Sequence, residues 1–286
     1  MRIFTETIGK IKSHNEGNAS YKLGTNQFAD VTFNEFVKMN QINESTQRID
    51  IEAKSVTFDF SHIEDLNVPS SFDWRSRGAV TKVQNQESCG CCYAFAALGA
   101  IESIFFLKHG NLIDLSVQEI VDCASEKYHT WGCDGGFVFH VFDYVKDNRE
   151  VSLASDYPYE STRRHCRLGD TSKVQVDLVG FVETPWGDEE LLKKIIAHIG
   201  PVTVSLDINH ESFMRYSTGI YNEPDCTHLT NHALLLIGYG SEGDQDFWIV
   251  KNSFGEAWGE RGFMRLLRHF HNHCGIGIES YFPILN

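Results

Sequence analysis

Three cysteines fall within four residues, in segment 89–92, and the last of them has a setting that suits nucleophilic chemistry. Cys92 stands at the predicted start of a long helix, where the helix dipole and free backbone N–H groups favour a thiolate. Far along the chain, His232 begins a buried apolar segment and Asn252 lies in a glycine-rich turn. These residue types suit a thiolate nucleophile, a histidine that holds charge beside it, and a polar group that orients the imidazole.

The same cysteines have a plainer interpretation as disulfide partners or zinc ligands. A zinc site needs paired Cys-x-x-Cys ligands and a second pair at suitable spacing. Residues 89–92 could supply one pair, but Cys123 and Cys133 are ten residues apart and do not form a convincing second. A lone histidine is also weak evidence, because the chain has 13 of them. The joint occurrence of the three residues favours catalysis, and we expect no metal and no cofactor.

The residues around these positions form a specific pattern, with Cys-Gly-Cys-Cys-Tyr at 89–93, Asn-His-Ala at 231–233 and Asn-Ser-Phe-Gly at 252–255. In this order they resemble papain and the cathepsins across essentially all of residues 68–286. The resemblance implies a papain-like cysteine endopeptidase that uses Cys92, His232 and Asn252 in the roles given above. It also implies that the Gln86 side chain and the Cys92 backbone N–H stabilise the oxyanion of the tetrahedral intermediate.

Four positions depart from the commonest pattern of this family. Cys91 replaces a small Ser or Ala, and Tyr93 follows the nucleophile where Trp is usual. Phe254 stands where Trp usually shields the Asn–His hydrogen bond, and Glu87 replaces a glycine. Both aromatic replacements should preserve shielding, and none of the changes removes a catalytic group.

Six cysteines match the disulfide bridges of the family. Sequence alone allows 15 pairings of six cysteines, and the resemblance implies the pairs Cys89–Cys133, Cys123–Cys166 and Cys226–Cys274. Cys91 is left over. It is interpreted either as a buried, inert thiol or as one partner of a reversible bond near the site.

Several further residues map by resemblance to the substrate cleft. Gly135 and Gly136 would pair their backbone with a bound peptide, although tight-turn glycines are the plainer interpretation. The pocket for the second residue before the cleaved bond would contain Phe137, Val138, Ser205, Thr230 and Glu279, and the other substrate-binding residues would be Asn231, Phe254 and Trp258. An acid at the pocket base predicts acceptance of Arg as well as Phe or Leu, unless the carboxylate swings out to solvent.

The elements that must position these residues change in type along the chain. Helices are predicted over 92–109, after the capping-box pattern at 116–119, and over 188–198. Strands are predicted over 202–206, 232–238, 247–250 and 262–267. The fold class is therefore α+β, and two packed halves of different type imply a cleft between them. The resemblance implies the papain-like two-lobed fold, with a helix-rich N-terminal lobe and a strand-rich, barrel-like C-terminal lobe.

Residues 1–67 differ from residues 68–286 because they are polar and contain none of the eight cysteines. A helical stripe of Ile3, Phe4, Ile8 and Ile11 and a strand-like segment at 21–23 precede a connector at 40–67 that shows little periodicity. Residues 1–35 resemble the inhibitory pro-segment of the cathepsin L group, truncated at its N-terminus, and 24–30 match its second motif well. We therefore expect an auto-inhibited zymogen whose mature domain starts at 68, released as carboxylates such as Asp30 lose charge in acid.

Composition bounds the remaining possibilities. The 286 residues are 42% hydrophobic and 22% charged, with a net charge of −14 and no basic stripe, which argues against nucleic-acid binding. No apolar run of membrane-spanning length and no signal peptide are seen, yet eight cysteines and sequons at Asn18 and Asn43 suit a secretory route. We expect a lysosomal or secreted monomer that acts on proteins and peptides and meets cystatin-type inhibitors. The alternatives are an inactive relative or a cystine-rich binding module, but the nucleophile and histidine of an active enzyme are both present.

Overall fold

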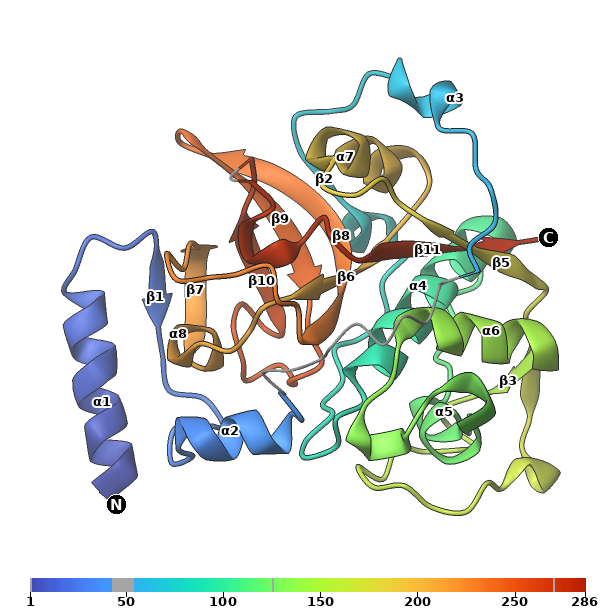
Figure 1. Ribbon diagram of the computed structural model, residues 1–286, viewed down its shortest axis with the longest axis horizontal. Helices are drawn as coiled ribbons and strands as arrows, with labels where there is room; N and C mark the ends of the chain where they lie inside the picture. Colours follow the sequence, from blue (N-terminus) through green and yellow to red (C-terminus); the bar gives the residue numbers. More distant parts are fainter. Residues whose placement is uncertain (1, 43–53, 125, 270) are drawn as a thin grey trace.

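The computed structural model describes residues 2–42, 54–124, 126–269 and 271–286. The helices are α1 (Arg2–Asn15), α2 (Phe33–Met39), α3 (Ser61–Glu64), α4 (Cys92–His109), α5 (Val117–Cys123), α6 (Val138–Asn148), α7 (Glu189–His198) and α8 (Glu211–Met214). The strands are β1 (Tyr21–Leu23), β2 (Phe72–Asp73), β3 (Glu150–Ser152), β4 (Lys173–Gln175), β5 (Leu178–Glu183), β6 (Val202–Leu206), β7 (Tyr216–Tyr221), β8 (His232–Glu242), β9 (Gln245–Lys251), β10 (Phe263–Leu267) and β11 (Ser280–Leu285). Figure 1 shows α4, α5 and α6 gathered on one side of the molecule, the strands β8, β9 and β10 near its centre, and α1, β1 and α2 on the far side of these strands.

Helix α4 is the central helix of the helix-rich half. Its first three turns are buried almost throughout, and it ends where Gly110 adopts the left-handed conformation with φ 73°. By length and composition alone α4 is apolar enough to span a membrane, but 56% of it is buried inside the molecule, as is usual for a core helix. Gly99 lets the backbone of α4 approach Leu235 of β8, which brings the start of α4 against the strand-rich half.

The larger sheet has the strand order β1-β7-β10-β9-β8-β6-β11-β5, and β2 pairs with β8 away from this path. Its pairs are antiparallel except for β7 with β10. Strands β8 and β9 are consecutive, so the residues at the start of β8 and the end of β9 lie side by side. This register brings His232 and Asn252 together.

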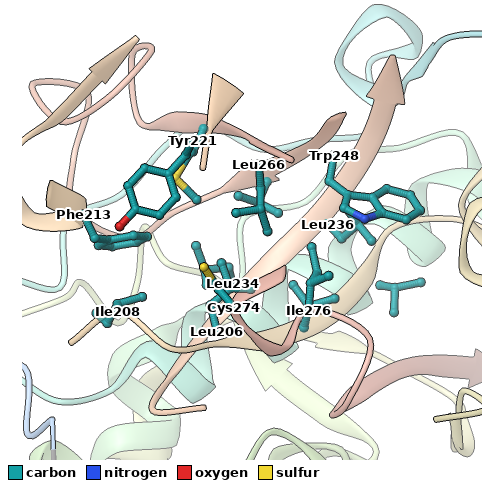
Figure 2. Packing of buried hydrophobic residues seen from close by; sticks show 14 of the residues in the cluster. Leu206, Ile208, Phe213, Tyr221, Leu234, Leu236, Trp248, Leu266, Cys274 and Ile276 are labelled. Carbon is teal, nitrogen blue, oxygen red and sulfur yellow. The ribbon is translucent and has the colours of Figure 1, made fainter. Parts of the chain in front are cut away.

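Apolar side chains form two clusters, one in each half. Figure 2 shows the cluster of the strand-rich half, which includes Phe213, Tyr221, Leu234, Leu236 and Trp248. The second cluster surrounds α4, α5 and α6 and includes Ile101, Ile120 and Phe142. Alternate residues of β8 point into different clusters, so this strand joins the two halves.

The N-terminal segment packs against the strand-rich half. Strand β1 extends the large sheet by pairing with β7, and α2 continues from there toward the junction of the two halves (Figure 1). Lys10 of α1 forms an ion pair of 2.6 Å with Glu211 of α8. The segment therefore binds along the strand-rich half by backbone pairing and charge.

The structure corrects three expectations about local structure. The helix over the first 15 residues is present, but Phe4 and Ile8 are 45% and 40% exposed and the buried side chain is Thr7. In the connector expected at 40–67, Asn40, Ile42 and Ile63 are buried and α3 is helical, while the sequon at Asn43 lies outside the described residues. At 116–119 only half of the capping box forms: Ser116 accepts from the Glu119 N–H, but the Glu119 carboxylate binds Tyr144 and the Ser152 N–H instead.

Candidate active site

Cys92 is the first residue of α4 and is partly exposed, whereas Cys91 before it is completely buried. Burial raises the pKa of the Cys92 thiol, and backbone hydrogen bonds from Ala233 and Tyr93 act in the opposite direction. Ala233 follows His232, so the sulfur of Cys92 lies against the start of β8.

His232 is buried and its Nε2 atom lies 2.8 Å from Oδ1 of Asn252. The same Oδ1 accepts the Ser253 backbone N–H at 2.8 Å, which identifies this atom as the oxygen of the carboxamide. Nε2 of His232 must therefore carry the hydrogen, and Nδ1 of the neutral ring keeps a free lone pair. Within the described residues Nδ1 has no hydrogen-bond partner.

The Gln86 side chain is fully buried and held at three points. Its Oε1 accepts the Ser253 hydroxyl at 2.6 Å, so its amino group faces the other way. One N–H of that group donates to the Cys89 carbonyl at 3.1 Å. The other donates at 3.2 Å to Oδ1 of Asn40, a residue of the N-terminal segment.

Asn40 caps the C-terminal end of α2 and is buried in the cleft. Its Nδ2 donates to the Phe36 carbonyl at 2.9 Å, which turns its oxygen toward Gln86. The next residue, Gln41, has φ 53° and lies over Gly90, so that a Cβ at Gly90 would sit 2.7 Å from the Gln41 side chain. The N-terminal segment therefore covers the donor group of Gln86 and the backbone beside it.

Burial also acts on the charge state of the candidate pair. Burial lowers the pKa of His232 to about 4, although the hydrogen bond to Asn252 acts in the opposite direction. Burial shifts the pKa of Cys92 upward as well, so it disfavours the charged form of both groups. The thiolate–imidazolium pair expected from the sequence stays a prediction for the enzyme without its N-terminal segment.

Phe254 shields the His232–Asn252 contact, with ring centroids 4.9 Å apart from His232. Its outer side packs edge-on against Phe28 and Phe36 of the N-terminal segment. Trp258 lies behind it and donates its indole N–H to the Phe213 carbonyl at 3.0 Å. The aromatic residue after the cysteine has another task, because the Tyr93 hydroxyl donates to the Gly132 carbonyl at 3.0 Å.

The two glycines expected to face the substrate have different constraints. A Cβ at Gly136 would lie 2.9 Å from the Tyr93 ring, so this position requires glycine to pack on α4. Gly135 has φ 109°, which favours glycine, and open space where a Cβ would project. Phe137 follows them and stacks on Phe139 at 5.4 Å.

The residues expected to form the specificity pocket come from three elements. Val138 is the first residue of α6 and is buried. Ser205 of β6 pairs with Ala233, beside His232. Thr230 donates its hydroxyl to the Glu279 carboxylate at 3.1 Å, so these two predicted pocket residues touch.

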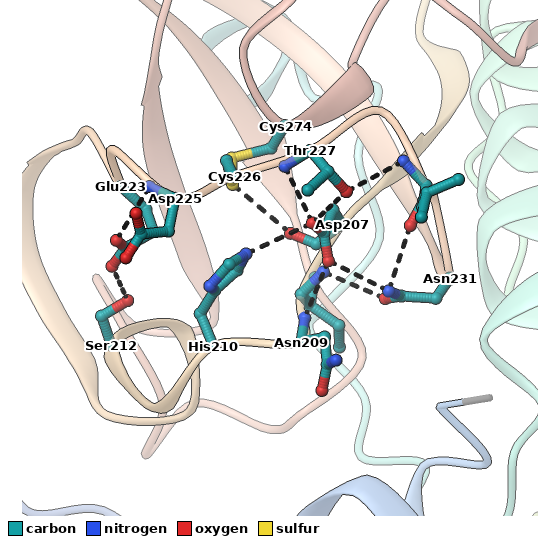
Figure 3. A network of polar contacts seen from close by, with 12 residues as sticks. Asp207, Asn209, His210, Ser212, Glu223, Asp225, Cys226, Thr227, Asn231 and Cys274 are labelled. Carbon is teal, nitrogen blue, oxygen red and sulfur yellow. Dashed lines mark hydrogen bonds and ion pairs between the residues drawn. A yellow bond between two sulfur atoms is a disulfide. The ribbon is translucent and has the colours of Figure 1, made fainter. Parts of the chain in front are cut away.

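Asn231, which precedes His232, is held by Asp207 (Figure 3). Its Nδ2 donates to Asp207 at 3.1 Å, and its Oδ1 accepts the Ile208 N–H at 3.0 Å. Asp207 also accepts hydrogen bonds from Thr227 and His210, which hold its pKa well below the usual range despite its burial. This network ties the end of β6 and the loop before β8 into one unit.

The structure contains the disulfides Cys89–Cys133, Cys123–Cys166 and Cys226–Cys274, and Cys91 and Cys92 are free. The bridge at Cys226 lies against the Asp207 network. The groups of metal-ligand type that lie close together in the described residues, around Asp207 and His273, depend on Cys226 or Cys274. Their sulfurs are bonded to each other and are not available as ligands.

Three residues of the site were missed by sequence reasoning. Asn40 was placed in a connector, although the Thr32-x-x-Glu35 pattern is a capping box that marks the start of the helix it ends. Ser253 lies within the Asn-Ser-Phe-Gly pattern at 252–255 but was given no role, and Asp207 acts through contacts between distant segments that no local pattern of the sequence signals.

Comparison with known proteins assigns the class of this site. Residues 68–284 match the model of the papain family cysteine proteases, and residues 1–36 match the cathepsin propeptide inhibitor domain. The chain therefore belongs to the papain family and is a cysteine endopeptidase that carries an inhibitory pro-segment.

Individual relatives narrow the class to cathepsin L-like proteins. The chain is 43% identical to cathepsin L of Sarcophaga peregrina, over 99% of this chain and 85% of that protein, and 41% identical to cathepsin L1 of Drosophila melanogaster, over 100% and 79%. Among solved structures, it is similar to digestive procathepsin L 3 of Tenebrio molitor larval midgut, with a TM-score of 0.88, 34% identity and coverage of 99% and 90%. It is also similar to the proform of the ragweed pollen cysteine protease Amb a 11, with a TM-score of 0.89, 35% identity and coverage of 100% and 88%.

Proposed function

We propose that Cys92 is the nucleophile of this cysteine endopeptidase, with His232 as its acid–base partner, Asn252 as the group that orients the imidazole and Gln86 as an oxyanion donor. The observation that carries this proposal is the hydrogen-bond chain on the His232–Asn252 side. Because Asn252 accepts the Nε2 hydrogen, the lone pair of Nδ1 is left to receive the thiol proton. The position of Gln86 also supports the proposal. Within the described chain its cleft-facing N–H is bound only by the pro-segment residue Asn40.

The reaction then follows from these groups. Once the pro-segment leaves, water and substrate dipoles reach the pair, and the Cys92 proton moves to Nδ1 of His232. The thiolate attacks the peptide carbonyl, and the oxyanion receives N–H groups from Gln86 and from the Cys92 backbone. The imidazolium returns its proton to the leaving amine, and a water molecule activated by His232 hydrolyses the thioester.

The zymogen would consist of a pro-segment at 1–67 and a peptidase domain at 68–286. The Tyr239 hydroxyl holds the Pro69 carbonyl at 3.0 Å, so the start of the peptidase domain is anchored independently of the pro-segment. The substrates would be proteins and peptides bound along Gly135 and Gly136. The three disulfides and the named cathepsin relatives support a lysosomal or secreted protein. A monomer that meets cystatin-type inhibitors completes the proposal.

Alkylation tests the assignment of the nucleophile. We expect iodoacetamide to label Cys92 of the acid-processed enzyme rapidly at mildly acidic pH and to leave Cys91 unlabelled, because Cys91 is buried and its pKa is raised. Peptide mass mapping locates the label. Cys92→Ala should abolish peptide hydrolysis, whereas Asn252→Ala should leave a measurable fraction. Label on Cys91, or equal residual rates in the two variants, would show that these roles are wrong.

A further inference from the structure

The hydroxyl of Tyr159 joins the backbone of Gln86 to the thiol of Cys91. The Tyr159 oxygen lies 2.8 Å from the Gln86 carbonyl oxygen and 3.1 Å from the Cys91 sulfur. A carbonyl oxygen only accepts, so the tyrosine hydrogen points to Gln86. The Cys91 thiol must therefore donate its own hydrogen to the Tyr159 oxygen.

Both groups remain protonated across the pH range in which such an enzyme works. Burial raises the pKa of the Cys91 thiol and of the Tyr159 phenol. Cys91 thus has a chemical role opposite to that of Cys92: it serves as a fixed hydrogen donor, and the adjacent cysteine ionises.

Tyr159 is held firmly enough to act as an anchor. Its ring packs edge-on against Phe95 of α4, with centroids 5.2 Å apart. On one side of it the Tyr157 hydroxyl donates to Asp122 at 2.8 Å, and on the other the Glu160 N–H donates to Gln118 at 2.8 Å. Both acceptors belong to α5, so segment 157–160 is attached to a buried helix.

The turn that carries Gln86 needs such an anchor. Glu87 has φ 54°, a left-handed conformation that costs a residue with a side chain about 1 kcal/mol. The Gln86 carbonyl receives the Tyr159 hydroxyl and the Cys89 N–H, and the Gln86 amino group binds the Cys89 carbonyl. Release of the Tyr159 bond would let this turn relax and would move the carboxamide.

We propose that Tyr159, held by the Cys91 thiol, is a positioning residue that keeps the carboxamide of Gln86 aimed at the oxyanion. This inference rests on the proposed role of Gln86 as an oxyanion donor. It assigns a structural use to the cysteine that stands where the family usually has Ser or Ala, and it gives Tyr159 a function that its distance along the chain from Gln86 conceals.

Tyr159→Phe is the first test, carried out on the processed enzyme. Loss of an oxyanion donor lowers kcat by about 100- to 1,000-fold. A donor that is present but misplaced should lower kcat by only part of this factor, about 10-fold. We expect kcat to fall by about this factor with KM changed less than about two-fold. Tyr128→Phe is the matched control, because its hydroxyl binds Asp147 on the surface and touches nothing in the site.

Two reagents distinguish a misplaced Gln86 carboxamide from a general loss of stability. A peptide aldehyde adds to the Cys92 sulfur, and its oxygen becomes the group that Gln86 should stabilise. Iodoacetamide reacts with the Cys92 sulfur by loss of iodide from its carbon atom, and this reaction forms no oxyanion. In Tyr159→Phe, aldehyde affinity should fall by the same factor as kcat, while the alkylation rate of Cys92 stays within about two-fold of the parent.

The Cys91 variants supply the second test. Cys91→Ser keeps a donor for Tyr159 and should retain most of the aldehyde affinity, whereas Cys91→Ala should lose several-fold. In the Tyr159→Phe background, Cys91→Ala should add no further loss, because the two groups act in one chain. If Tyr159→Phe does not fold, the difference in aldehyde affinity between Cys91→Ser and Cys91→Ala still tests the positioning role.

Gln86→Ala distinguishes a failure of the proposed Tyr159 role from a failure of the proposed Gln86 role. If it lowers aldehyde affinity strongly and Tyr159→Phe does not, the positioning role is wrong and the proposed function stands. If Gln86→Ala leaves aldehyde affinity unchanged, the proposed oxyanion role of Gln86 itself fails. Equal loss of aldehyde affinity and of alkylation rate in Tyr159→Phe would place the defect at Cys92 and would also overturn the inference.

Discussion

Glu279 is the residue whose environment says most about substrate choice. Its carboxylate accepts the hydroxyl of Thr230 at 3.1 Å, and Thr230 belongs to the predicted pocket. The contact holds the acid beside Thr230, so we expect the carboxylate to face the predicted pocket and not to swing out to solvent.

We therefore predict that Arg is accepted two residues before the cleaved bond, beside Phe and Leu. A charge-assisted hydrogen bond contributes roughly 1.5–3 kcal/mol, or about 10- to 100-fold in specificity. The ratio of kcat/KM for Arg over Phe substrates should fall by that factor in Glu279→Ala. Glu279→Gln is the control that keeps size and removes charge, and both variants should spare the Phe substrate. An unchanged ratio would mean that the acid does not reach the bound arginine.

At this scale the sequence identifies residues that act by chemical type in a recognisable order, such as the Cys92, His232 and Asn252 set. It does not identify Asn40 or Tyr159. Their side chains are common types, and their roles depend on what the fold brings within 3.2 Å of Gln86.

Helix α2 is the element that closes the site, because its end places Asn40 on Gln86. A complete capping box begins it: the Thr32 hydroxyl accepts the Glu35 N–H, and the Glu35 carboxylate accepts the Thr32 N–H. Its buried Phe36 packs against Phe28 and Phe254. A helix of this length is marginal without such support.

We predict that Thr32→Ala weakens latency. Loss of an N-cap costs about 1 kcal/mol, so the uncovered fraction of the zymogen should rise about five-fold. The rate of iodoacetamide labelling of Cys92 in the unprocessed chain at neutral pH measures that fraction. Thr25→Ala is the control, since Thr25 is exposed in the same segment and makes no hydrogen bond within the described residues. Equal labelling in both variants would exclude α2 as the latch.

Asp30, one of the carboxylates expected to trigger release in acid, is exposed and makes no ion pair in the described part of the chain, whereas Glu35 belongs to the cap of α2. The bonds from Thr32 lower the pKa of Glu35. A carboxyl whose pKa is lower in the folded than in the unfolded state stabilises the fold fully at a pH above its unfolded-state pKa. This stabilisation is lost as the pH falls through the folded-state pKa. We therefore expect acid to weaken the N-terminal cap of α2 at Glu35. The sequence predicted α4 from its long apolar run closed by Gly110, α7 from its apolar period, and the long strands from their apolar runs. It missed α2 because a short helix shows no clear period.

At the scale of the whole molecule, a buried polar chain joins the two halves behind the site. Glu102 of α4 accepts the Thr81 hydroxyl at 2.7 Å, and Thr81 accepts Lys251 of β9 at 2.9 Å. They line a small cavity of about 20 Å³ that also reaches Asn252. Burial raises the pKa of Glu102 to about 7, and the nearby Lys251 acts in the opposite direction.

This arrangement predicts a fold that is weaker at neutral pH than in mild acid. Because the folded pKa of Glu102 lies above the unfolded value of about 4.3, the folded state retains a proton that the unfolded state has lost between these values. The stabilisation that the Glu102 proton contributes is therefore fully present below about pH 4.3 and is lost as pH rises to about 7. The difference between these two pKa values corresponds to roughly 3–4 kcal/mol.

Glu102→Gln mimics the protonated acid and tests this prediction. In a Cys92→Ala background, which prevents self-cleavage, the variant should have a higher Tm than its parent at pH 7 and an equal Tm at pH 4.5. Glu256→Gln, at an exposed position, should track the parent at both values. Parallel Tm curves for the parent and Glu102→Gln would show that Glu102 does not titrate in this window.

Strand β1 lies at the outer end of the large sheet and covers β7. Its removal during maturation therefore turns β7 from an interior strand into an edge strand, with unpaired N–H and C=O groups along one side. Such edges recruit other extended chains, and proteins protect them by bending or interrupting the strand. Gly219, at φ 95° in the middle of β7, supplies such a bend. Maturation thus exposes, together with the catalytic centre, a backbone surface on which the mature enzyme's resistance to aggregation depends.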